Sequence, residues 1–389
     1  MSDRLSLFAI TAPGLEPVCA AELRALGIEG AAEPGGVAWE GTADDLFTAN
    51  LWLRTASRVV VRVASFRART FFELERHARK IAWERWVAKG RPVRLRVTSK
   101  KSKLYHEGAI AERVLGWIDG RVGGIGASEA EKGSAEEDEG ETGDAQLFLV
   151  RVVRDEVTVS ADASGALLHL RGYRQAVAKA PLRETLAAGM LLGAGWRGST
   201  PLVDPMCGSG TIPIEAALIA RNIAPGLARA SGEPRDYAFQ HWPDFDAVRW
   251  VEAVERARTA AAPSASAPIL GSDRDAGAIE AARANAARAG VSDDAAFEVR
   301  SVSAIEAPPG PGLLIANPPY GVRVGESDAL RSLYAALGRV ARERCPGWRL
   351  ALLSADRKLE GQVGIAFGEA FRTSNGGIPV RLVVGTVPG

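Results

Sequence analysis

The stretch LVDPMCGSGT at residues 202–211 places a short apolar strand before a glycine-rich turn and the start of a helix. Glycines in such a turn let the backbone pass close to a ligand, and the amide N–H groups that open the helix can face it. The turn has neither the Gly-Lys-Ser/Thr ending of a Walker loop nor the spacing Gly-x-Gly-x-x-Gly. A glycine pair alone is more typical of a tight turn without a ligand, so the interpretation depends on the segments around it.

Apolar strands alternate with helices from about residue 180 to the end of the chain. This alternation predicts an α/β domain with a mostly parallel sheet, helices on both faces and a terminal antiparallel hairpin. Ligands of such sheets bind at the carboxyl ends of the strands, near the point where the strand order reverses. The strands after the first are expected in PILGSDRD (268–275), AAFEVRSV (295–302), GLLIANPPYG (312–321), WRLALLSAD (348–356) and the hairpin FRTSNGGIPVRLVVGTV (371–387).

An acidic residue, Asp273, ends the strand that follows the glycine-rich turn. A carboxylate at this position can accept hydrogen bonds from both ribose hydroxyls of a nucleoside. Asp275 is better explained as the N-cap of the following helix. The two features together predict a nucleoside ligand that does not need a phosphate loop.

The segment IANPPYG at residues 315–321 places two prolines directly after an apolar strand. Each proline forces the residue before it into an extended conformation, so Asn317 and Pro318 are both extended and the loop is stiff. The backbone carbonyl groups and the Asn317 side chain then offer two fixed acceptors side by side, which suits an exocyclic –NH2 group. Tyr320 supplies a flat face on which a nucleobase can stack.

An amine on an aromatic ring is a poor nucleophile because its lone pair is delocalised into the ring. Two acceptors that hold its hydrogens favour a pyramidal nitrogen with the lone pair aimed at an electrophile. With a sulfonium methyl as the electrophile, catalysis is mostly alignment, which contributes roughly 7–11 kcal/mol. No Cys, His or Ser nucleophile is arranged here, and we interpret Cys207 as a small side chain that fills space under the turn.

The charge of the N-terminal half is strongly asymmetric. Residues 54–113 contain 17 Lys and Arg against 5 Asp and Glu, and aromatic residues lie between them. This pattern is more typical of a surface that binds a polyanion such as RNA than of a surface that is only solvated. Residues 119–145 contain 9 acidic and 2 basic residues and are rich in glycine, so we expect a disordered loop. The residues that we expect to contact RNA are Arg94, Lys100, Lys101 and Lys103.

Several classes of protein are disfavoured by composition. The three cysteines and four histidines are scattered, so no metal site is expected. No apolar run of about 18 residues is present and the start of the chain does not resemble a secretory signal. We therefore expect a cytoplasmic protein without membrane or metal partners.

Two motifs resemble those of class I S-adenosylmethionine-dependent methyltransferases that modify amino groups. DPMCGSG (204–210) is similar to their cofactor motif and NPPYG (317–321) to their catalytic motif, and NPPY is shared by families that methylate adenine N6, guanine N2 or a glutamine amide. A more specific resemblance runs nearly end to end: TAPGLEPVCAAELRALGI, HLRGYR, LRETLAAGMLLGAGW and PMCGSGTIPIEAALIARNIAPGL are similar to the THUMP-domain guanine-N2 methyltransferases of 23S ribosomal RNA.

This resemblance implies an N-terminal ferredoxin-like unit (1–62), a THUMP RNA-binding domain (63–165) and a C-terminal Rossmann-like methyltransferase domain (166–389). It implies that the methionine and ribose of the cofactor contact Asp204, Met206, Gly208 and Gly210. Asp273 would hold the ribose hydroxyls, Thr185 the methionine carboxylate, and Asn317, Pro318 and Tyr320 the target guanine. Ser301 stands where relatives often have an acidic residue near the adenine amine.

The function that the resemblance implies is methylation of the exocyclic N2 amine of a guanine in large-subunit ribosomal RNA by a monomer. Three different functions stay open beside it: a guanine-N2 methyltransferase of transfer RNA, an adenine-N6 methyltransferase of DNA, and a non-catalytic RNA-binding factor that retains a cofactor pocket.

Overall fold

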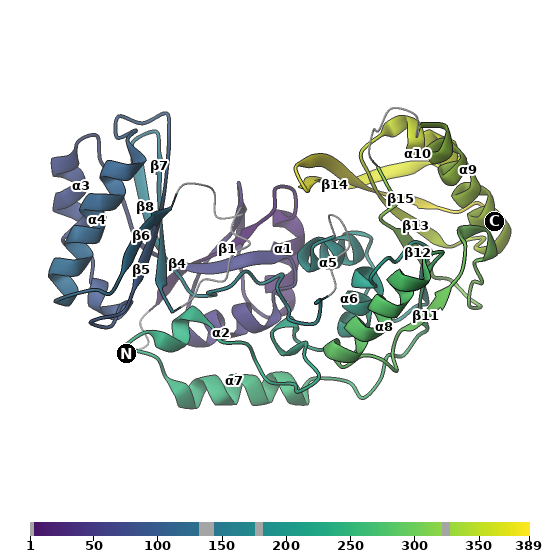
Figure 1. Cartoon of the computed structure of the whole chain (residues 1–389), viewed down its shortest axis with the longest axis horizontal. Coiled ribbons are helices and arrows are strands. Elements are labelled where there is room, and N and C mark those ends of the chain that lie inside the picture. The colour runs from purple at the N-terminus through teal and green to yellow at the C-terminus, as the bar shows by residue number, and fades with distance from the viewer. Residues whose placement is uncertain (1–3, 132–143, 176–181, 321–326) are drawn as a thin grey trace.

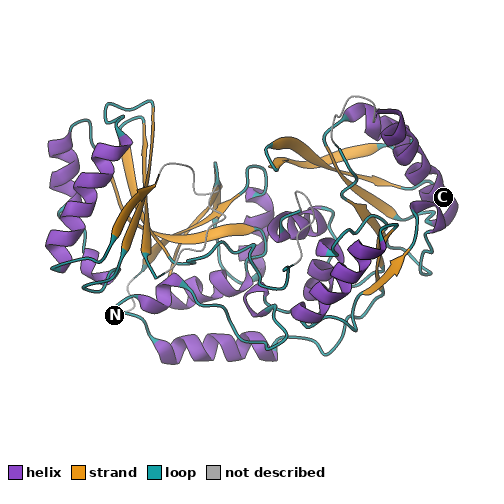
Figure 2. Cartoon of the chain, viewed as in Figure 1, coloured by secondary structure: helices purple, strands orange, loops and turns teal. Residues whose placement is uncertain are grey.

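The computed structural model describes residues 4–131, 144–175, 182–320 and 327–389. Its strands form two sheets, one toward each end of an elongated molecule, and helices pack against both (Figure 1). Figure 2 shows that helices lie on both sides of the C-terminal sheet. Within the described residues, no helix is both long and apolar enough to cross a lipid bilayer.

The first sheet has the strand order β2-β3-β1-β4-β8-β7-β5-β6. Its strands are β1 (Leu5–Thr11), β2 (Ala31–Glu33), β3 (Gly36–Gly41), β4 (Ala56–Arg67), β5 (Val93–Lys100), β6 (Ser128–Glu131), β7 (Gln146–Val153) and β8 (Glu156–Asp162). The helices that accompany it are α1 (Glu16–Ala25), α2 (Ala43–Trp52), α3 (Phe71–Ala78), the short η1 (Trp83–Arg85) and α4 (Glu107–Val122).

The long strand β4 joins the two N-terminal units that the sequence indicates. Its first half pairs with β1 and its second half with β8, and the register shifts between Arg62 and Ala64. The predicted boundary at residues 62–63 therefore falls inside a strand, and the two units share one continuous sheet.

Local sequence signals account for the helix starts and one tight turn of this part. Thr42 and Thr70 each accept a hydrogen bond from the backbone three residues later and begin α2 and α3 as capping boxes. Arg154 and Asp155 adopt positive φ angles of 53° and 69° in the turn between β7 and β8, as a two-residue hairpin requires.

The prediction of a disordered acidic loop at residues 119–145 is wrong for the N-terminal part of this segment. Residues 119–122 form the last turn of α4, and β6 pairs in parallel with β5, with Ser128 opposite Val93. Composition misled the prediction because an edge strand is held by backbone hydrogen bonds, which do not depend on apolar side chains. Residues 132–143 of the predicted loop lie outside the described residues.

The second sheet has the order β11-β10-β9-β12-β13-β15-β14 and is parallel except for β14 and β15. Its strands are β9 (Leu202–Asp204), β10 (Ile269–Asp273), β11 (Ala296–Val299), β12 (Leu313–Ala316), β13 (Arg349–Ser354), β14 (Phe367–Asn375) and β15 (Ile378–Thr386). The predicted mostly parallel sheet with a terminal antiparallel hairpin is confirmed.

Helices cover the two faces of this sheet through separate apolar clusters. Buried side chains of α5 (Glu184–Gly193), α6 (Thr211–Ala220) and α8 (Ala276–Ala289) pack on one face, and those of α9 (Ser327–Arg344) and α10 (Arg357–Val363) on the other. The remaining elements of this half are η2 (Pro225–Leu227), η3 (Ala238–His241), α7 (Ala247–Thr259) and η4 (Val302–Ala304).

The N-terminal part is docked tightly on the C-terminal half. Leu15 is 1% exposed and belongs to the apolar cluster of α5 and α6, and a Cβ on Gly189 would lie 2.9 Å from it. Two buried arginines reinforce the contact: Arg54 donates to the carbonyl of Ile223 at 2.7 Å, and Arg171 donates to the carbonyl of Arg54 at 2.7 Å. The two halves therefore share buried surface instead of being connected only by a linker.

Candidate active site

The carboxyl ends of β9, β10 and β12 meet at one edge of the second sheet. Gly271 pairs with Asp204, and Leu314 pairs with Val203, so the residues that follow these three neighbouring strands lie close together. The chain leaves β9 toward β10 and β11 and then returns to β12 on the opposite side of β9. The structure thus brings Asp204, Asp273 and Asn317 to the point where the strand order reverses, which is where such sheets bind ligands.

The two glycines of the turn after β9 serve different needs. Gly210 has φ +86° at the N-cap of α6, and a Cβ there would lie 2.9 Å from Ala282 and 3.0 Å from the ring of Phe297. Gly208 has φ +52°, and nothing lies within 4 Å of the position that its Cβ would take. Gly210 is therefore required for packing, whereas Gly208 leaves open space over the turn for a ligand to approach the backbone.

Asp273 fastens this turn to β10. One carboxylate oxygen accepts from the amide of Gly208 at 3.1 Å and the other from the amide of Asp275 at 3.0 Å. Each carboxylate oxygen has a second lone pair, so both can still accept from a ribose hydroxyl. Asp275 caps α8 through the amides of Gly277 and Ala278, as predicted.

Asp204 is a buried carboxyl beside Asp273. It is 1% exposed and accepts one hydrogen bond, from the amide of Met206 at 3.1 Å. The pKa of Asp204 is raised to about 8, mainly by burial and also by the charge of Asp273, while the hydrogen bond from Met206 opposes the shift. A cationic group bound here would favour the ionised form, so the site is suited to an ammonium ligand.

Cys207, between these acids, is also buried. Burial first, and then the charges of Asp204 and Asp273, raise the pKa of its thiol far above its usual range. A thiol in this state is not a nucleophile, which supports the interpretation of Cys207 as a space-filling residue.

Asn317 carries an unsatisfied acceptor. It follows β12, whose four residues are all buried, and it is held before the buried Pro318. Among the described residues its side-chain oxygen Oδ1 is buried and has no hydrogen-bond partner. Leaving such a group unpaired costs on the order of 1–3 kcal/mol, which a ligand N–H group would recover.

Tyr320 is held by a residue that the sequence analysis did not identify. Its hydroxyl accepts a hydrogen bond of 2.5 Å from the side-chain amide of Asn375 at the end of β14. Burial raises the pKa of this hydroxyl, and the hydrogen bond opposes that shift. The motif NGG indicated a hairpin turn, but no local pattern could show that its Asn meets a tyrosine 55 residues away.

Three other predicted cofactor residues lie around this edge. Thr185 is buried in the first turn of α5, and Met206 is half-buried in the glycine-rich turn. Ser301 is exposed directly after β11, and its hydroxyl lies 2.9 Å from that of Ser303. Their contacts with a cofactor stay predictions. Among the described residues, no group of acidic, His and Cys side chains is arranged to hold a metal ion.

The four residues expected to contact RNA do not form one patch. Lys100, Lys101 and Lys103 are exposed at the end of β5, and the amide of Lys103 donates to Asp155 in the turn between β7 and β8. Arg94 is half-buried near the start of β5, six residues earlier, which at about 3.3 Å per residue is roughly 20 Å from Lys100. The three lysines form one basic group, and Arg94 stands apart from it.

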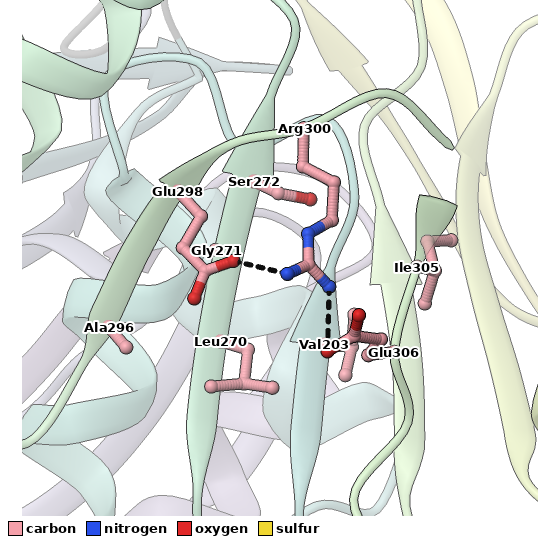
Figure 3. Close-up of a pocket in the computed structure, with 9 residues that line it drawn as sticks. All are labelled: Val203, Leu270, Gly271, Ser272, Ala296, Glu298, Arg300, Ile305 and Glu306. Carbon is pink, nitrogen blue, oxygen red and sulfur yellow. Dashed lines mark ion pairs between the residues drawn. The ribbon is translucent and has the colours of Figure 1, made fainter. Parts of the chain in front are cut away.

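A small pocket beside β10 and β11 is not part of this site. It has a volume of about 60 Å³, well below the roughly 300 Å³ of small ligand pockets, and Val203, Leu270 and Ile305 place it on the α9 face of the sheet. Figure 3 shows Arg300 in this pocket between Glu298 and Glu306, at 2.6 and 3.1 Å. Its positive charge is already balanced.

Comparison with known families assigns two parts of the chain to described protein families. Residues 171–383 match the family described as "RMKL-like, methyltransferase domain", and residues 6–60 match the "RlmL ferredoxin-like domain". With the observed strand order, these matches confirm the predicted ferredoxin-like and Rossmann-like folds. The assignment of residues 63–165 to a THUMP domain stays a prediction.

Two relatives match almost the whole chain. A protein of Synechocystis, named as a candidate RNA methyltransferase, is 34% identical over 97% of this chain and 95% of its own length. The ribosomal RNA large subunit methyltransferase K/L of Syntrophotalea carbinolica is 37% identical over 98% of this chain. The chain spans only 54% of that protein, so it corresponds to about half of it.

Two solved structures have the same fold over their full length. A protein from Listeria monocytogenes, named as a predicted N6-adenine-specific DNA methylase, is 32% identical, with a TM-score of 0.83 over 100% of this chain and 97% of its own. A candidate methyltransferase, SMU.472, complexed with SAH, is 30% identical, with a TM-score of 0.84 over 100% and 99%.

The raised pKa of Asp204 predicts a pH-dependent cost to stability. Asp204 keeps its proton in the folded chain up to about pH 8, whereas the unfolded chain loses it near pH 4, so folding takes up a proton between these values. The contribution of this group to the free energy of unfolding therefore falls by up to about 1.4 kcal/mol per pH unit as the pH rises. Asp204→Asn removes this dependence.

We expect the melting temperature of ligand-free Asp204→Asn to exceed that of the wild-type protein by a margin that grows from pH 5 to pH 8. Thermal melts across this range measure the margin. A difference in melting temperature that stays constant from pH 5 to pH 8 would contradict the raised pKa of Asp204.

Proposed function

The chain belongs to the family of RMKL-like methyltransferases, and from this premise we propose that it methylates the exocyclic N2 amine of a guanine in 23S ribosomal RNA with S-adenosylmethionine as the methyl donor. The observation that carries the proposal is the unpaired, buried Oδ1 of Asn317 next to a tethered Tyr320, at the carboxyl edge of the strands.

The residues of the site fit S-adenosylmethionine. Asp204 offers a buried carboxyl to the ammonium of the methionine, and Asp273 retains free lone pairs for the ribose hydroxyls. The open space at Gly208 lets the cofactor approach the backbone. When bound, the cofactor supplies a methyl group on a positively charged sulfur, which needs no protein nucleophile.

The catalytic loop performs alignment. Asn317 Oδ1 and the backbone carbonyl of Pro318 accept the two hydrogens of the target amine, while Tyr320 stacks on the base. Because the hydrogen bond from Asn375 fixes the tyrosine hydroxyl, the ring keeps one orientation when the base arrives. Preorganisation of this kind contributes on the order of several kcal/mol, since it removes the entropy of orienting the reactants.

The target guanine must leave its stack to reach this loop, since a paired amine already donates its hydrogens. Strand β5, which ends at Lys100, belongs to the N-terminal sheet, at the other end of the elongated molecule from β12 and β13 (Figure 1). An RNA substrate would span both parts, with a THUMP domain at residues 63–165 gripping its backbone. A monomeric state and a cytoplasmic location stay predictions.

Ribosomal RNA is favoured as the substrate by the name of the K/L relative and by the match of residues 6–60 to a ferredoxin-like domain of the same protein type. The name of the Listeria protein gives one specific reason to keep adenine-N6 methylation of DNA as a second candidate. Methylation of transfer RNA and a non-catalytic RNA-binding role have no such specific observation in their favour, and the experiment below distinguishes them as well.

Mass spectrometry of nucleosides from a deletion strain separates these functions. We expect the loss of N2-methylguanosine from 23S ribosomal RNA and its return when the wild-type chain is supplied. Loss from transfer RNA alone, loss of N6-methyladenine from DNA, or no change in any nucleic acid would each refute the proposal in favour of the corresponding function.

Asn317→Ala removes one of the two acceptors for the target amine. We expect turnover to fall at least about a hundredfold, in line with the loss of a group that acts in the transition state. The affinity for S-adenosylmethionine, measured by calorimetry, should change less than about threefold, which is under 1 kcal/mol. Equal losses in turnover and cofactor affinity would show that Asn317 holds the cofactor instead of the base.

Tyr320→Phe and Asn375→Ala test whether Asn375 acts through the tyrosine hydroxyl. Each change removes the same hydrogen bond, so we expect each to lower turnover by roughly fivefold, a loss of about 1 kcal/mol. The double variant should be no slower than the slower single variant. Ser374→Ala, at the exposed neighbouring position, is the matched control. If the losses of turnover were additive in the double variant, Asn375 would not act through the hydroxyl of Tyr320.

Replacement of Lys100, Lys101 and Lys103 by Gln should weaken RNA binding and lower the salt slope of log K by roughly 2–3, at about 0.7–0.9 per lost phosphate contact. Addition of Arg94→Gln should change the slope much less, because Arg94 lies apart from the lysines. Titrations at several salt concentrations measure both. If the triple variant bound like the wild-type protein, the lysines would be only a solvated surface.

A further inference from the structure

A cavity lies where the first sheet, the segment that leaves it and the insertion between α6 and α7 meet. Its volume is about 410 Å³, within the range of about 300–1,000 Å³ of pockets that bind small ligands. Part of its wall is backbone of residues 165–170. The polar side chains that line it are Arg91, Asp144, Arg229, Arg235, Asp236 and His241.

The three arginines reach the cavity from separate segments and differ in how they are held. Arg235 is 7% exposed and donates to the backbone carbonyls of Ala166 and Leu167. Arg91 donates through Nε to the carbonyl of Asp144 at 2.9 Å, and its Nη1 is buried without a hydrogen-bond partner in the described part of the chain. Arg229 is exposed.

The acidic side chains of the cavity offset part of this charge, since Asp144 and Asp236 both favour the charged form of Arg91 and raise its pKa against the effect of burial. Asp236 lies 2.9 Å from Nε2 of His241, with which it pairs, and Asp144 and Asp236 are both exposed to solvent. Within the described residues, no carboxylate lies within salt-bridge distance of Arg91, Arg229 or Arg235. The cavity therefore presents three guanidinium groups against two carboxylates, so an excess of positive charge is left.

Arginine charges also act on His169, which precedes Leu170 of the cavity wall. The pKa of His169 is lowered to about 3, mainly by burial and also by the charges of Arg183, Arg171, Arg174 and Arg235. Burial also lowers the pKa of Arg91 and of Arg235. An anion in the cavity would favour the charged forms of Arg91 and Arg235.

We propose that this cavity is a binding subsite for a backbone phosphate of the RNA substrate. Guanidinium groups match phosphate oxygens in charge and in the geometry of their donors, and the unpaired Nη1 of Arg91 supplies a donor that the protein itself does not satisfy. The inference rests on the proposed function insofar as the substrate is RNA.

The position of the subsite gives it a distinct role. Arg91 precedes β5 and Lys101 follows it, so at about 3.3 Å per residue they lie roughly 30 Å apart. Arg229 and Arg235 belong to the insertion of the methyltransferase half. The lysines hold RNA far from the catalytic half, and the cavity holds it at the junction of the two halves, where a contact fixes the path of the strand toward Asn317.

The test compares two pairs of substitutions that remove the same charge. The double substitution Arg91→Gln with Arg229→Gln removes two guanidinium groups from the cavity and leaves the buried Arg235 unchanged. Arg339→Gln with Arg344→Gln is the matched control, since both residues are exposed on α9 in the methyltransferase half. Binding to unmodified 23S ribosomal RNA, transcribed in vitro, is titrated without S-adenosylmethionine at several salt concentrations.

We expect the cavity pair to weaken binding at low salt by roughly tenfold and to lower the salt slope of log K by about 1.4–1.8, as for two lost phosphate contacts. The control pair should leave the slope unchanged, and Arg91→Lys with Arg229→Lys should restore most of it. The proposed subsite would be contradicted if the cavity pair had the salt slope of the wild-type protein, or if the control pair lost as much of the slope as the cavity pair.

Two features keep the test decisive. If the double variant melts at a lower temperature, Arg229→Gln alone, at an exposed position, should still lower the slope by about 0.7–0.9. Binding is measured without turnover, so failure of the proposed phosphate subsite can be distinguished from failure of the proposed methylation reaction. A methylated product other than N2-methylguanosine refutes the reaction, and an unchanged salt slope refutes the subsite.

Discussion

The parallel pairing of β9 with β10 on one side and β12 on the other is the constraint on which the candidate site depends. It brings the ends of three strands, far apart in the chain, to one edge of a sheet whose faces are both covered by helices. Once this pairing is formed, Asp204, Asp273 and Asn317 have no freedom to separate. The site is therefore held by the core of the domain and not by its loops.

The polar groups at this edge are placed at a cost to stability. Asp204 is a buried carboxyl with a raised pKa, and Asn317 retains a buried oxygen without a partner among the described residues. A fold selected for stability alone would satisfy or replace both groups. The proposed function accounts for both groups through ligands that would complete their hydrogen bonds, in keeping with the common conflict between stability and activity.

The docking of the two halves reaches the neighbourhood of this edge. Gly14, in the loop before α1, has φ +89°, and a Cβ there would lie 1.8 Å from the carbonyl oxygen of Arg372 in β14. Three residues further along the same strand, Asn375 holds Tyr320. The hairpin of β14 and β15 thus contacts the ferredoxin-like unit and the loop of Asn317 and Tyr320 at once, so the position of that loop is fixed relative to the N-terminal half.

The sequence by itself determined the parts of the protein that depend on local chemistry. It indicated the glycine-rich turn, the stiff NPPY loop, the cap at Asp275 and the terminal hairpin, because turns, caps and strand periodicity are governed by neighbouring residues. Only the tertiary structure decided that β4 runs through both N-terminal units, that part of the acidic segment joins the sheet as β6, that Arg94 stands apart from the lysines, and that Asn375 meets Tyr320. These features depend on strand pairing and on contacts between residues distant in the chain, and such contacts leave no periodic signal in a single sequence.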